Sequence, residues 1–358
     1  MVSFEDVFSF EHVLECALEC CKGVRWKAST QNFESQVLMW ASSLYEDLHA
    51  GRYRSRGFNS FTIHERGKTR HIQSVHISER CVQKCLVRHC LRPLVMNGLV
   101  SCSYATLPGK GTEAALKALK EHLRWWYARR GREGGFLAMD YHDYFGTISH
   151  AKLTEMYAGL PMDSRLLALT EYFIDCFDGD VGVGLGSEIS QISAVRYVSA
   201  VDHLFKDRFG FHCYARYMDD SYCIGGMAEL READAAMREV SAELGISLNE
   251  RVTGIRRLDQ GFRYLKKRIL LTETGKVVMR LERKNIAKRR AKVRGNAAAV
   301  ASGEMDAESE AASWQSWSSY AGKYDAHRTL ESVGKYRDEM LKTTQVNSEY
   351  FDNNGYII

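Results

Sequence analysis

Residues 211–226 read FHCYARYMDDSYCIGG, and this stretch decides the fold. Two runs rich in aromatic and apolar residues, 211–217 and 221–224, flank Asp219 and Asp220, which predicts a β-hairpin with both carboxylates at its tip. Successive side chains of a strand point to opposite faces, so adjacent carboxylates serve one site only where the backbone turns. Such a pair attracts a hard divalent cation, although an Asp-Asp pair in a hairpin is often only a solvated turn.

A second acidic motif favours the metal site. Residues 135–150 read GFLAMDYHDYFGTISH, in which a short apolar strand, 136–139, ends at Asp140. One carboxylate at a strand end and two at a hairpin tip form the ligand set of a two-metal site for phosphoryl transfer. We therefore expect Asp140, Asp219 and Asp220 to hold two Mg²⁺ ions, with Mn²⁺ as an alternative. Asp143 is expected to be a helix cap or a surface acid.

These two motifs resemble the palm of reverse transcriptases. That family carries Phe or Tyr five positions after the first aspartate, where the ring excludes a 2′-hydroxyl, and Phe145 stands there. The family also carries a glycine, three variable residues and Ser-Gln or Ser-Pro, which matches Gly186, Ser190 and Gln191. The resemblance implies that these residues contact the nucleotide pair being formed. The proline that many relatives carry two residues before the glycine is replaced by Gly184.

The resemblance extends upstream into the fingers of these enzymes. Residues 67–72 (GKTRHI) and 78–83 (SERCVQ) resemble a segment in which a lysine and an arginine grip the triphosphate. Lys68 and Arg70 alternate along the chain, so both can face one side of a strand. A solvated basic hairpin is the alternative. Residues 101–112 resemble the next fingers segment, and they would offer Lys110, together with Arg92, to a nucleic-acid backbone.

Downstream of the hairpin, apolar spacing predicts a helix over 230–244, followed by a turn into a strand at 245–249. Arg251 lies where relatives carry a lysine as a candidate general acid, and arginine is a poor acid at neutral pH. Residues 252–254 (VTG) match a triplet of retron enzymes in the wrong place, and we interpret them as coincidence. Residues 262–267 (FRYLKK) resemble a primer-grip hairpin, with Tyr264, Leu265 and Lys266 as its contacts.

The C-terminal third is basic and aromatic. Residues 283–294 (RKNIAKRRAKVR) concentrate positive charge, which usually marks a solvated helix face. In a polymerase thumb, Lys288, Arg289 and Arg290 would contact duplex phosphates. Aromatic residues at helical spacing are expected to form the thumb core, with a stacking platform as the alternative: Trp314, Trp317, Tyr320 and Tyr324. Residues 297–312 are expected to be a flexible loop.

Composition fits this interpretation. The chain has 358 residues, 45% hydrophobic residues and a formal charge of +4, which suits one globular unit of several packed parts. The ten cysteines do not form a disulfide framework in a chain of this size. Helical spacing predicts that Cys81, Cys85, His89 and Cys90 form one buried stripe and not a zinc site. Neither a signal peptide nor a long apolar run is recognisable, so we expect a cytoplasmic protein without a membrane partner.

The resemblance implies an α+β fold of the right-hand polymerase type. We expect N-terminal helices and fingers in 1–135, an RRM-like antiparallel-sheet palm in 136–275, a helical thumb in 276–345 and a tail in 346–358.

The expected activity is that of an RNA-directed DNA polymerase, a nucleotidyltransferase that adds dNTPs to a 3′-hydroxyl. The resemblance is to bacterial and phage enzymes of the group II intron-like, diversity-generating and defence-associated lineage. It implies an RNA template, expected to be a dedicated noncoding RNA in antiviral defence, and a DNA product; an accessory protein or a homo-oligomer stays open. The alternatives are a mutagenic enzyme of a diversity-generating retroelement and a catalytically idle RNA-binding scaffold, against which the intact carboxylates argue.

Overall fold

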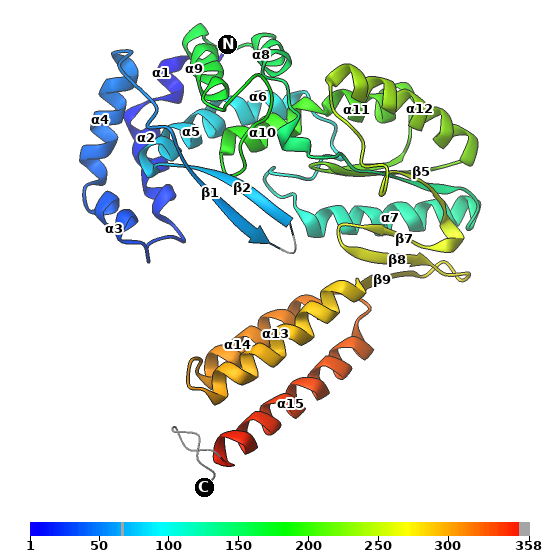
Figure 1. Ribbon diagram of the computed structural model, residues 1–358. Helices are drawn as coiled ribbons and strands as arrows, with labels where there is room; N and C mark the ends of the chain where they lie inside the picture. Colours follow the sequence, from blue (N-terminus) through cyan, green and yellow to red (C-terminus); the bar gives the residue numbers. More distant parts are fainter. Residues whose placement is uncertain (66–67, 351–358) are drawn as a thin grey trace. The chain divides into compact units, whose positions relative to one another are not determined.

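The computed structural model describes residues 1–65 and 68–350, and the side chains of these residues except 65, 68, 70, 71 and 344–350 (Figure 1). It is a mixed helix and sheet protein with small antiparallel sheets. The chain forms two compact units, residues 1–119 with 137–255 and residues 120–136 with 256–358. The predicted boundaries at 135, 275 and 345 concern subdomains and stay predictions.

Within the described ranges, no helix combines the length and the apolar character needed to cross a membrane.

The first unit is mainly helical. Its helices are α1 (Phe4–Val7), α2 (Phe10–Cys21), α3 (Ala28–Ser35), α4 (Val37–His49), α5 (Ile77–Leu86), α6 (Arg92–Asn97), α8 (His150–Ala158), α9 (Ser164–Asp175), α10 (Glu188–Tyr197), α11 (Ser199–His203) and α12 (Met227–Leu244). Short helical turns are η1 (Val87–Leu91), η2 (Tyr144–Gly146) and η3 (Leu204–Arg208), and α7 (Thr112–Arg130) crosses the division between the units. An antiparallel hairpin is formed by β1 (Phe58–Glu65) and β2 (Lys68–Val75).

A four-stranded sheet carries the two acidic motifs. Its strands are β3 (Gly135–Met139), β4 (Cys213–Tyr217), β5 (Asp220–Gly225) and β6 (Gly254–Arg257), in the spatial order β4-β5-β3-β6. Helices α8 to α11 connect β3 to β4, and α12 connects β5 to β6. This is the strand, helix, two strands, helix, strand pattern of a split βαβ sheet. In Figure 1, α11 and α12 lie together on one side of β5.

The predicted hairpin and the predicted strand before Asp140 are both present as strands. Strands β4 and β5 pair from Cys213 with Ile224 to Tyr217 with Asp220, which leaves Met218 and Asp219 as a two-residue turn. Met218 has a φ of 59°, the positive sign that the first residue of a primed hairpin turn requires. The predicted helix over 230–244 is also present as the larger part of α12, which ends at Gly245 with a φ of 77°. Residues 245–249 do not form a strand; Leu248 makes one antiparallel bridge, to Tyr141.

A buried ion pair fixes the turn that carries Asp219. Arg216 and Asp202 of α11 are fully buried, and the guanidinium donates to both carboxylate oxygens, with Nε at 2.8 Å from Oδ1 and Nη2 at 2.5 Å from Oδ2. The Tyr214 hydroxyl donates to the same carboxylate at 2.7 Å. Arg216 Nη2 also reaches the carbonyl of Val195 at 3.0 Å, and Nη1 reaches that of Met218 at 3.1 Å. Arg216, on the strand that leads into the strained turn, therefore holds the turn through the carbonyl of Met218.

The second unit combines a small sheet with helices. Its elements are η4 (Leu258–Gln260), β7 (Phe262–Tyr264), β8 (Lys267–Leu271), β9 (Val277–Leu281), α13 (Arg283–Ala301), α14 (Ala307–Gly322) and α15 (His327–Tyr350). Strands β7, β8 and β9 form an antiparallel sheet, and α13 packs along α15 and α14 (Figure 1). As predicted, Trp317 and Tyr324 belong to a core here, with Leu281, Ala321 and Ala326.

Two expectations for this unit are corrected. The flexible loop predicted over 297–312 is wrong, because 297–301 belong to α13 and 307–312 to α14, which leaves only 302–306 as the connection. Of the predicted tail, 346–350 continue α15, while 351–358 lie outside the described residues.

The buried ion pair predicts a large effect on stability. Replacing Arg216 with Met leaves the Asp202 carboxylate buried without its counter-charge, which costs about 3–5 kcal/mol. We expect the free energy of unfolding, measured in urea, to fall by this amount, and we expect Asp202→Leu added to Arg216→Met to recover much of it. The matched control is Arg257→Met, which breaks an exposed pair with Asp259 and should change the free energy by less than about 1 kcal/mol. Equal effects of the two single substitutions would contradict the assigned role of Arg216.

Candidate functional site

The structure brings the two acidic motifs to one edge of the four-stranded sheet. Asp140 follows the last residue of β3, and Asp220 begins β5, the neighbouring strand. Because neighbouring strands of this sheet run antiparallel, the end of β3 and the start of β5 lie at the same edge. All three aspartates are half-buried.

Tyr144 lies in the segment that follows β3. Its hydroxyl donates to the carbonyl of Ala194 at 2.5 Å, and its ring lies 5.5 Å from that of Tyr141. Burial, together with the nearby charge of Asp219, raises the pKa of Tyr144 well above its ordinary value, against the opposing charge of Arg216. The segment after β3 therefore lies beside the hairpin turn.

Asp140 is held by two residues that follow α12. The side-chain amide of Asn249 donates to Asp140 Oδ2 at 2.7 Å, and the backbone N–H of Asn249 donates to the Asp140 carbonyl at 2.8 Å. The hydroxyl of Thr253 accepts from the backbone N–H of Asp140 and donates to its carbonyl, both at 3.1 Å. These bonds orient the carboxylate on a fixed backbone. The 252–254 triplet, interpreted above as coincidence, thus has a local structural role.

Phe145 lies in the turn that follows. It is half-buried in η2, with its ring 5.8 Å from Tyr144. Its carbonyl accepts from the backbone N–H of Val183 at 2.8 Å, which ties this turn to the segment before Gly186. Asp143 precedes it with a φ of 45°, exposed and without a side-chain capping bond, so of the two predicted roles for it the surface acid is the one observed.

Gly186 lies where β2 meets the loop before α10. Its φ is 116°, which L side chains rarely adopt, and Leu185 beside it bridges to Ile72 of β2. At Gly184 a Cβ would come 2.4 Å from the side chain of Gln73, so the proline of many relatives would not fit this loop unless its neighbours moved. The glycine loop therefore packs directly on the strand that carries Lys68 and Arg70. The side chains of these two residues lie outside those that the structure describes.

Ser190 and Gln191 differ in accessibility. Ser187 caps α10 by accepting from the backbone of Ile189 at 3.2 Å, and its hydroxyl donates to Gln83 at 2.9 Å. Ser190 on the first turn is fully buried, so its predicted contact with a nucleotide requires a movement of α10. Gln191 is exposed.

Gln191 opens onto a polar cavity of about 290 Å³. The cavity is lined by Lys84, Val87, Arg92, Thr106, Glu188, Gln191 and Ile192. Glu188 pairs with Lys84 at 2.5 Å and lies 3.9 Å from Arg92, which is the residue predicted to meet a nucleic-acid backbone. Lys110, predicted to do the same, donates to the carbonyl of Ser101 at 2.5 Å and lies over the Tyr104 ring.

The predicted primer grip forms a tight hairpin in the second unit. Leu265 and Lys266 are its two turn residues, with φ of 44° and 61°, and Lys266 is exposed while Tyr264 is buried. Lys267 is almost fully buried. Its Nζ donates to the Tyr320 hydroxyl at 2.6 Å and lies 4.4 Å from the centre of the Tyr324 ring.

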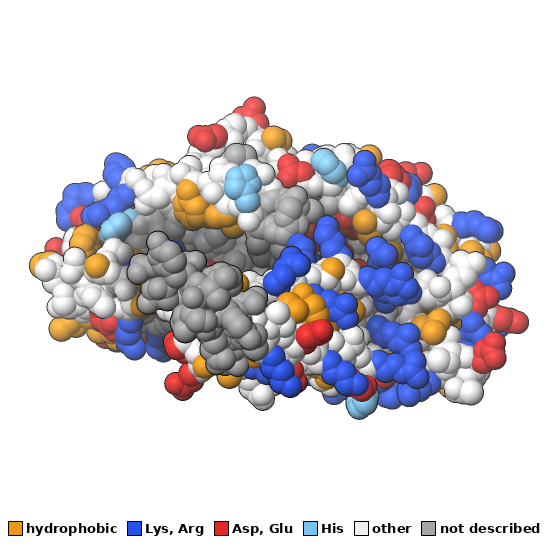
Figure 2. All heavy atoms as spheres, turned by 60° about the horizontal axis from the view of Figure 1, so that its bottom comes forward, with side chains coloured by type: hydrophobic (Ala, Val, Ile, Leu, Met, Phe, Trp, Pro, Cys, Tyr) orange, Lys and Arg blue, Asp and Glu red, His pale blue; other side chains and the backbone are white. Residues whose placement is uncertain are grey.

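The basic helix α13 is exposed over much of its length, and one prediction for it is corrected. The exposed cations are Arg283, Lys284, Lys288, Arg290, Lys292 and Arg294. Figure 2 shows one face of the chain, on which Lys and Arg side chains gather in the right-hand part. Arg289 is only 6% exposed, and its guanidinium lies 5.5 Å from the Trp314 ring and 5.3 Å from the Trp317 ring. The predicted phosphate contact of Arg289 is therefore replaced by a role in the core.

Sequence reasoning missed Arg216, Asn249 and Thr253 as parts of the site. Arg216 lies two residues before the hairpin turn, and an arginine among the inward-facing residues of an apolar strand is a signal that could have marked it. Asn249 and Thr253 contact Asp140 across more than a hundred residues, and no local pattern announces such a contact.

Comparisons with known proteins show a similarity of fold to a solved structure and no similarity of sequence to a known family. No profile of a known protein family matches the chain, and no curated protein matches it. Among solved structures, the telomerase of Candida albicans in complex with the TWJ fragment of telomeric RNA is similar, with a TM-score of 0.51 and 10% sequence identity. The match covers 83% of this chain and 62% of that one. At this identity the likeness concerns the fold alone: the chain resembles the telomerase structure in fold.

Proposed function

We propose that this protein is an RNA-directed DNA polymerase that adds deoxynucleotides to a 3′-hydroxyl. The observation that supports the proposal is the position of Asp140 and Asp220 at one edge of the sheet, with Asp219 in the hairpin turn, where Met218 has a strained backbone. Functional sites are where such strain is usually found. The polymerase-like fold raises the prior for this chemistry.

We propose that the carboxylates at this edge hold two Mg²⁺ ions. Carboxylate oxygens are the ligands that Mg²⁺ prefers, and waters and substrate phosphates commonly complete its shell. Bound at Asp140, Asp219 and Asp220, the ions would activate the 3′-hydroxyl and stabilise the departing pyrophosphate. The chain's own part is to fix these carboxylates: Asn249 orients Asp140, and Arg216 holds the carbonyl of Met218 beside Asp219.

The neighbouring residues suit a nucleoside triphosphate. We assign sugar selection to the Phe145 ring, because an aromatic side chain beside the sugar leaves no room for a 2′-hydroxyl. Gly186 allows backbone to approach a base closely, and its loop packs on β2, which carries Lys68 and Arg70 as proposed phosphate ligands. An RNA template is proposed from the sequence motifs and from the RNA-bound telomerase of similar fold.

For the biological role we propose the copying of a dedicated noncoding RNA in antiviral defence; the Gly186 to Gln191 pattern resembles both defence-associated and diversity-generating enzymes. Diversity generation is the alternative within the same chemistry. Sequencing the nucleic acid that copurifies with the chain separates them: a single RNA with a faithful complementary DNA supports the first role, and a DNA that carries many mutations relative to its RNA template supports the second.

The first prediction from the proposed function concerns the carboxylates. Asp140→Asn and Asp219→Asn should each remove several kcal/mol of transition-state stabilisation, which lowers the rate of primer extension at least about a hundredfold. Binding of template-primer should change little. Asp143→Asn is the matched control, because Asp143 is exposed and asparagine accepts its positive φ. Extension by either of the first two variants at the rate of the control would end the two-metal assignment.

The second prediction concerns the sugar. Phe145→Val keeps the backbone bond to Val183 and removes the ring, so the ratio of ribonucleotide to deoxynucleotide incorporation should rise by about tenfold or more. Single-nucleotide extension with each substrate measures the ratio directly. A wild-type enzyme that uses both substrates equally would show that Phe145 serves packing only.

The third prediction separates surface from core on α13. Lys288→Gln with Arg290→Gln should lower the salt dependence of duplex binding, by a slope of about 0.9 for each phosphate that is no longer neutralised. Arg289→Gln should leave that slope unchanged and instead lower the unfolding temperature, since its buried guanidinium lies against the rings of Trp314 and Trp317. A larger change of slope in Arg289→Gln than in the double variant would reverse the assignment.

A further inference from the structure

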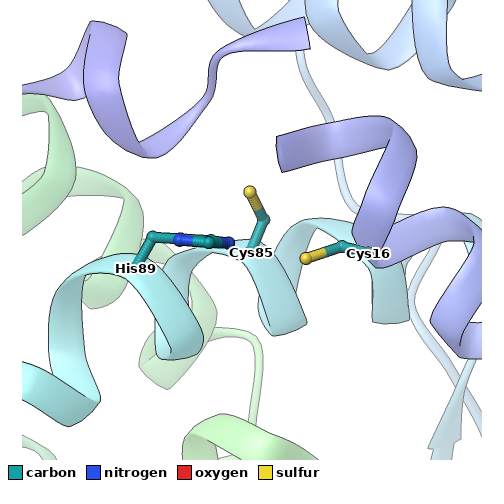
Figure 3. Close-up of side chains that lie close together, drawn as sticks. All are labelled: Cys16, Cys85 and His89. Carbon is teal, nitrogen blue, oxygen red and sulfur yellow. The ribbon is translucent and has the colours of Figure 1, made fainter. Parts of the chain in front are cut away.

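Two helices of the first unit bring metal-binding side chains together away from the carboxylate edge. Cys16 lies on α2, Cys85 on α5 and His89 on the adjoining turn η1. One donor atom from each lies within 4.8 Å of the other two. Figure 3 shows the His89 ring and the Cys16 sulfur reaching toward each other, with Cys85 between them.

The spacing of these residues is that of a helical chelate. Cys85 and His89 are four residues apart, so both face the same side of their helix. On the facing helix, His12 precedes Cys16 by four residues, and its ring is stacked on that of His89 with centres 3.7 Å apart. A His-x₃-Cys pair of α2 therefore meets a Cys-x₃-His pair of α5 and η1, which gives the donor set of a Cys₂His₂ site.

Each histidine has a ring nitrogen that could bind a metal ion. Within the described part of the chain, His89 Nε2 is buried and has no hydrogen-bond partner, which in a native protein asks for an explanation. His12 Nδ1 lies 2.7 Å from the Asp6 carbonyl. A carbonyl can only accept, so Nδ1 carries the proton and Nε2 has a lone pair. In this structure the bond holds His12 stacked on His89, so His12 can become a ligand only when its ring turns and gives up the bond to Asp6.

Burial gives the site a closed inner side and an open outer one. Cys16 and Cys85 are fully buried, and Cys85 Sγ donates to the carbonyl of Val7 at 3.0 Å. His12 and His89 are only half-buried, so an ion can enter past them. The helix also changes at this point, because η1 is a π-helical turn, and such turns are frequent at functional sites.

We propose that this cluster is a structural zinc site, with Cys16, Cys85 and His89 as ligands and His12 as the fourth after a turn of its side chain. Both thiols lose their protons to solvent as the ion binds, and Cys85 gives up its bond to Val7. The ion then joins α2 to α5 and η1, two segments almost seventy residues apart. The site is independent of the polymerase proposal. Of the four residues expected to form a plain buried stripe, Cys81 and Cys90 keep that role.

The test uses the full chain purified without chelator. Elemental analysis should find about one zinc per chain. After the metal is stripped, Co²⁺ should produce the intense visible absorption of a tetrahedral site with thiolate ligands, and zinc should abolish it. Zinc should also raise the unfolding temperature of the stripped protein, since an ion that binds only the folded state stabilises it.

Variants locate the ion. Cys16→Ser and His89→Gln should lose the cobalt absorption, while Cys90→Ser should keep it, because Cys90 is equally buried and adjacent in sequence but lies outside the group. His89→Gln changes a half-buried residue, so its folding, followed by circular dichroism, should be retained. Less than about a tenth of an equivalent of zinc together with no cobalt absorption in the wild type would overturn the proposal. Loss of absorption in Cys90→Ser equal to that in Cys16→Ser would overturn it as well.

Discussion

The fully buried ion pair between Arg216 and Asp202 is the constraint on which the carboxylate edge depends. Burial alone would lower the pKa of Arg216, and the charge and hydrogen bonds of Asp202 outweigh this and raise it. The guanidinium makes four hydrogen bonds in a fixed planar arrangement, to both Asp202 oxygens and to the carbonyls of Val195 and Met218. A lysine offers a point charge without that fork. One side chain thus joins β4, α10, α11 and the turn before Asp219.

Backbone strain marks the same places as the sequence motifs. Among the described residues, the non-glycine positions with positive φ are Thr106, Asp143, Met218, Leu265 and Lys266. Thr106 lines the cavity beside Gln191, and Asp143 follows the first aspartate by three residues. The others form the two-residue turns of the acidic hairpin and of the predicted primer grip. Each such residue costs about 1–3 kcal/mol, which the surrounding structure must supply. The positive φ angles are a property of the backbone, so they mark these segments without reference to the sequence motifs.

The sequence predicted those secondary-structure elements that depend on residues close to one another in the chain. The acidic hairpin, the strand before Asp140 and the helix before Gly245 were all predictable, because alternation, aromatic flanks and a glycine stop act within a few residues. The burial of Arg289 could not be predicted, because basic residues occur on every side of α13. Only the packing against Trp314 and Trp317 shows that Arg289 faces inward. The contacts of Asn249 with Asp140 and of Cys16 with Cys85 depend on tertiary folding and leave no trace in nearby sequence. The predicted loop over 297–312 failed because alanine and glutamate are strong helix formers.

The cage around Lys267 has a mechanical consequence. Its ammonium is anchored by the Tyr320 hydroxyl and covered by the rings of Tyr320 and Tyr324. Strand β8 and helix α14 are therefore locked together immediately behind the exposed tip at Lys266. Because a close-packed interior transmits displacement instead of absorbing it, we expect the turn at Lys266 and helix α14 to move together. Any ligand that displaces the exposed turn at Lys266 would therefore also displace α14, and a substitution at Tyr320 or Tyr324 would separate the two movements.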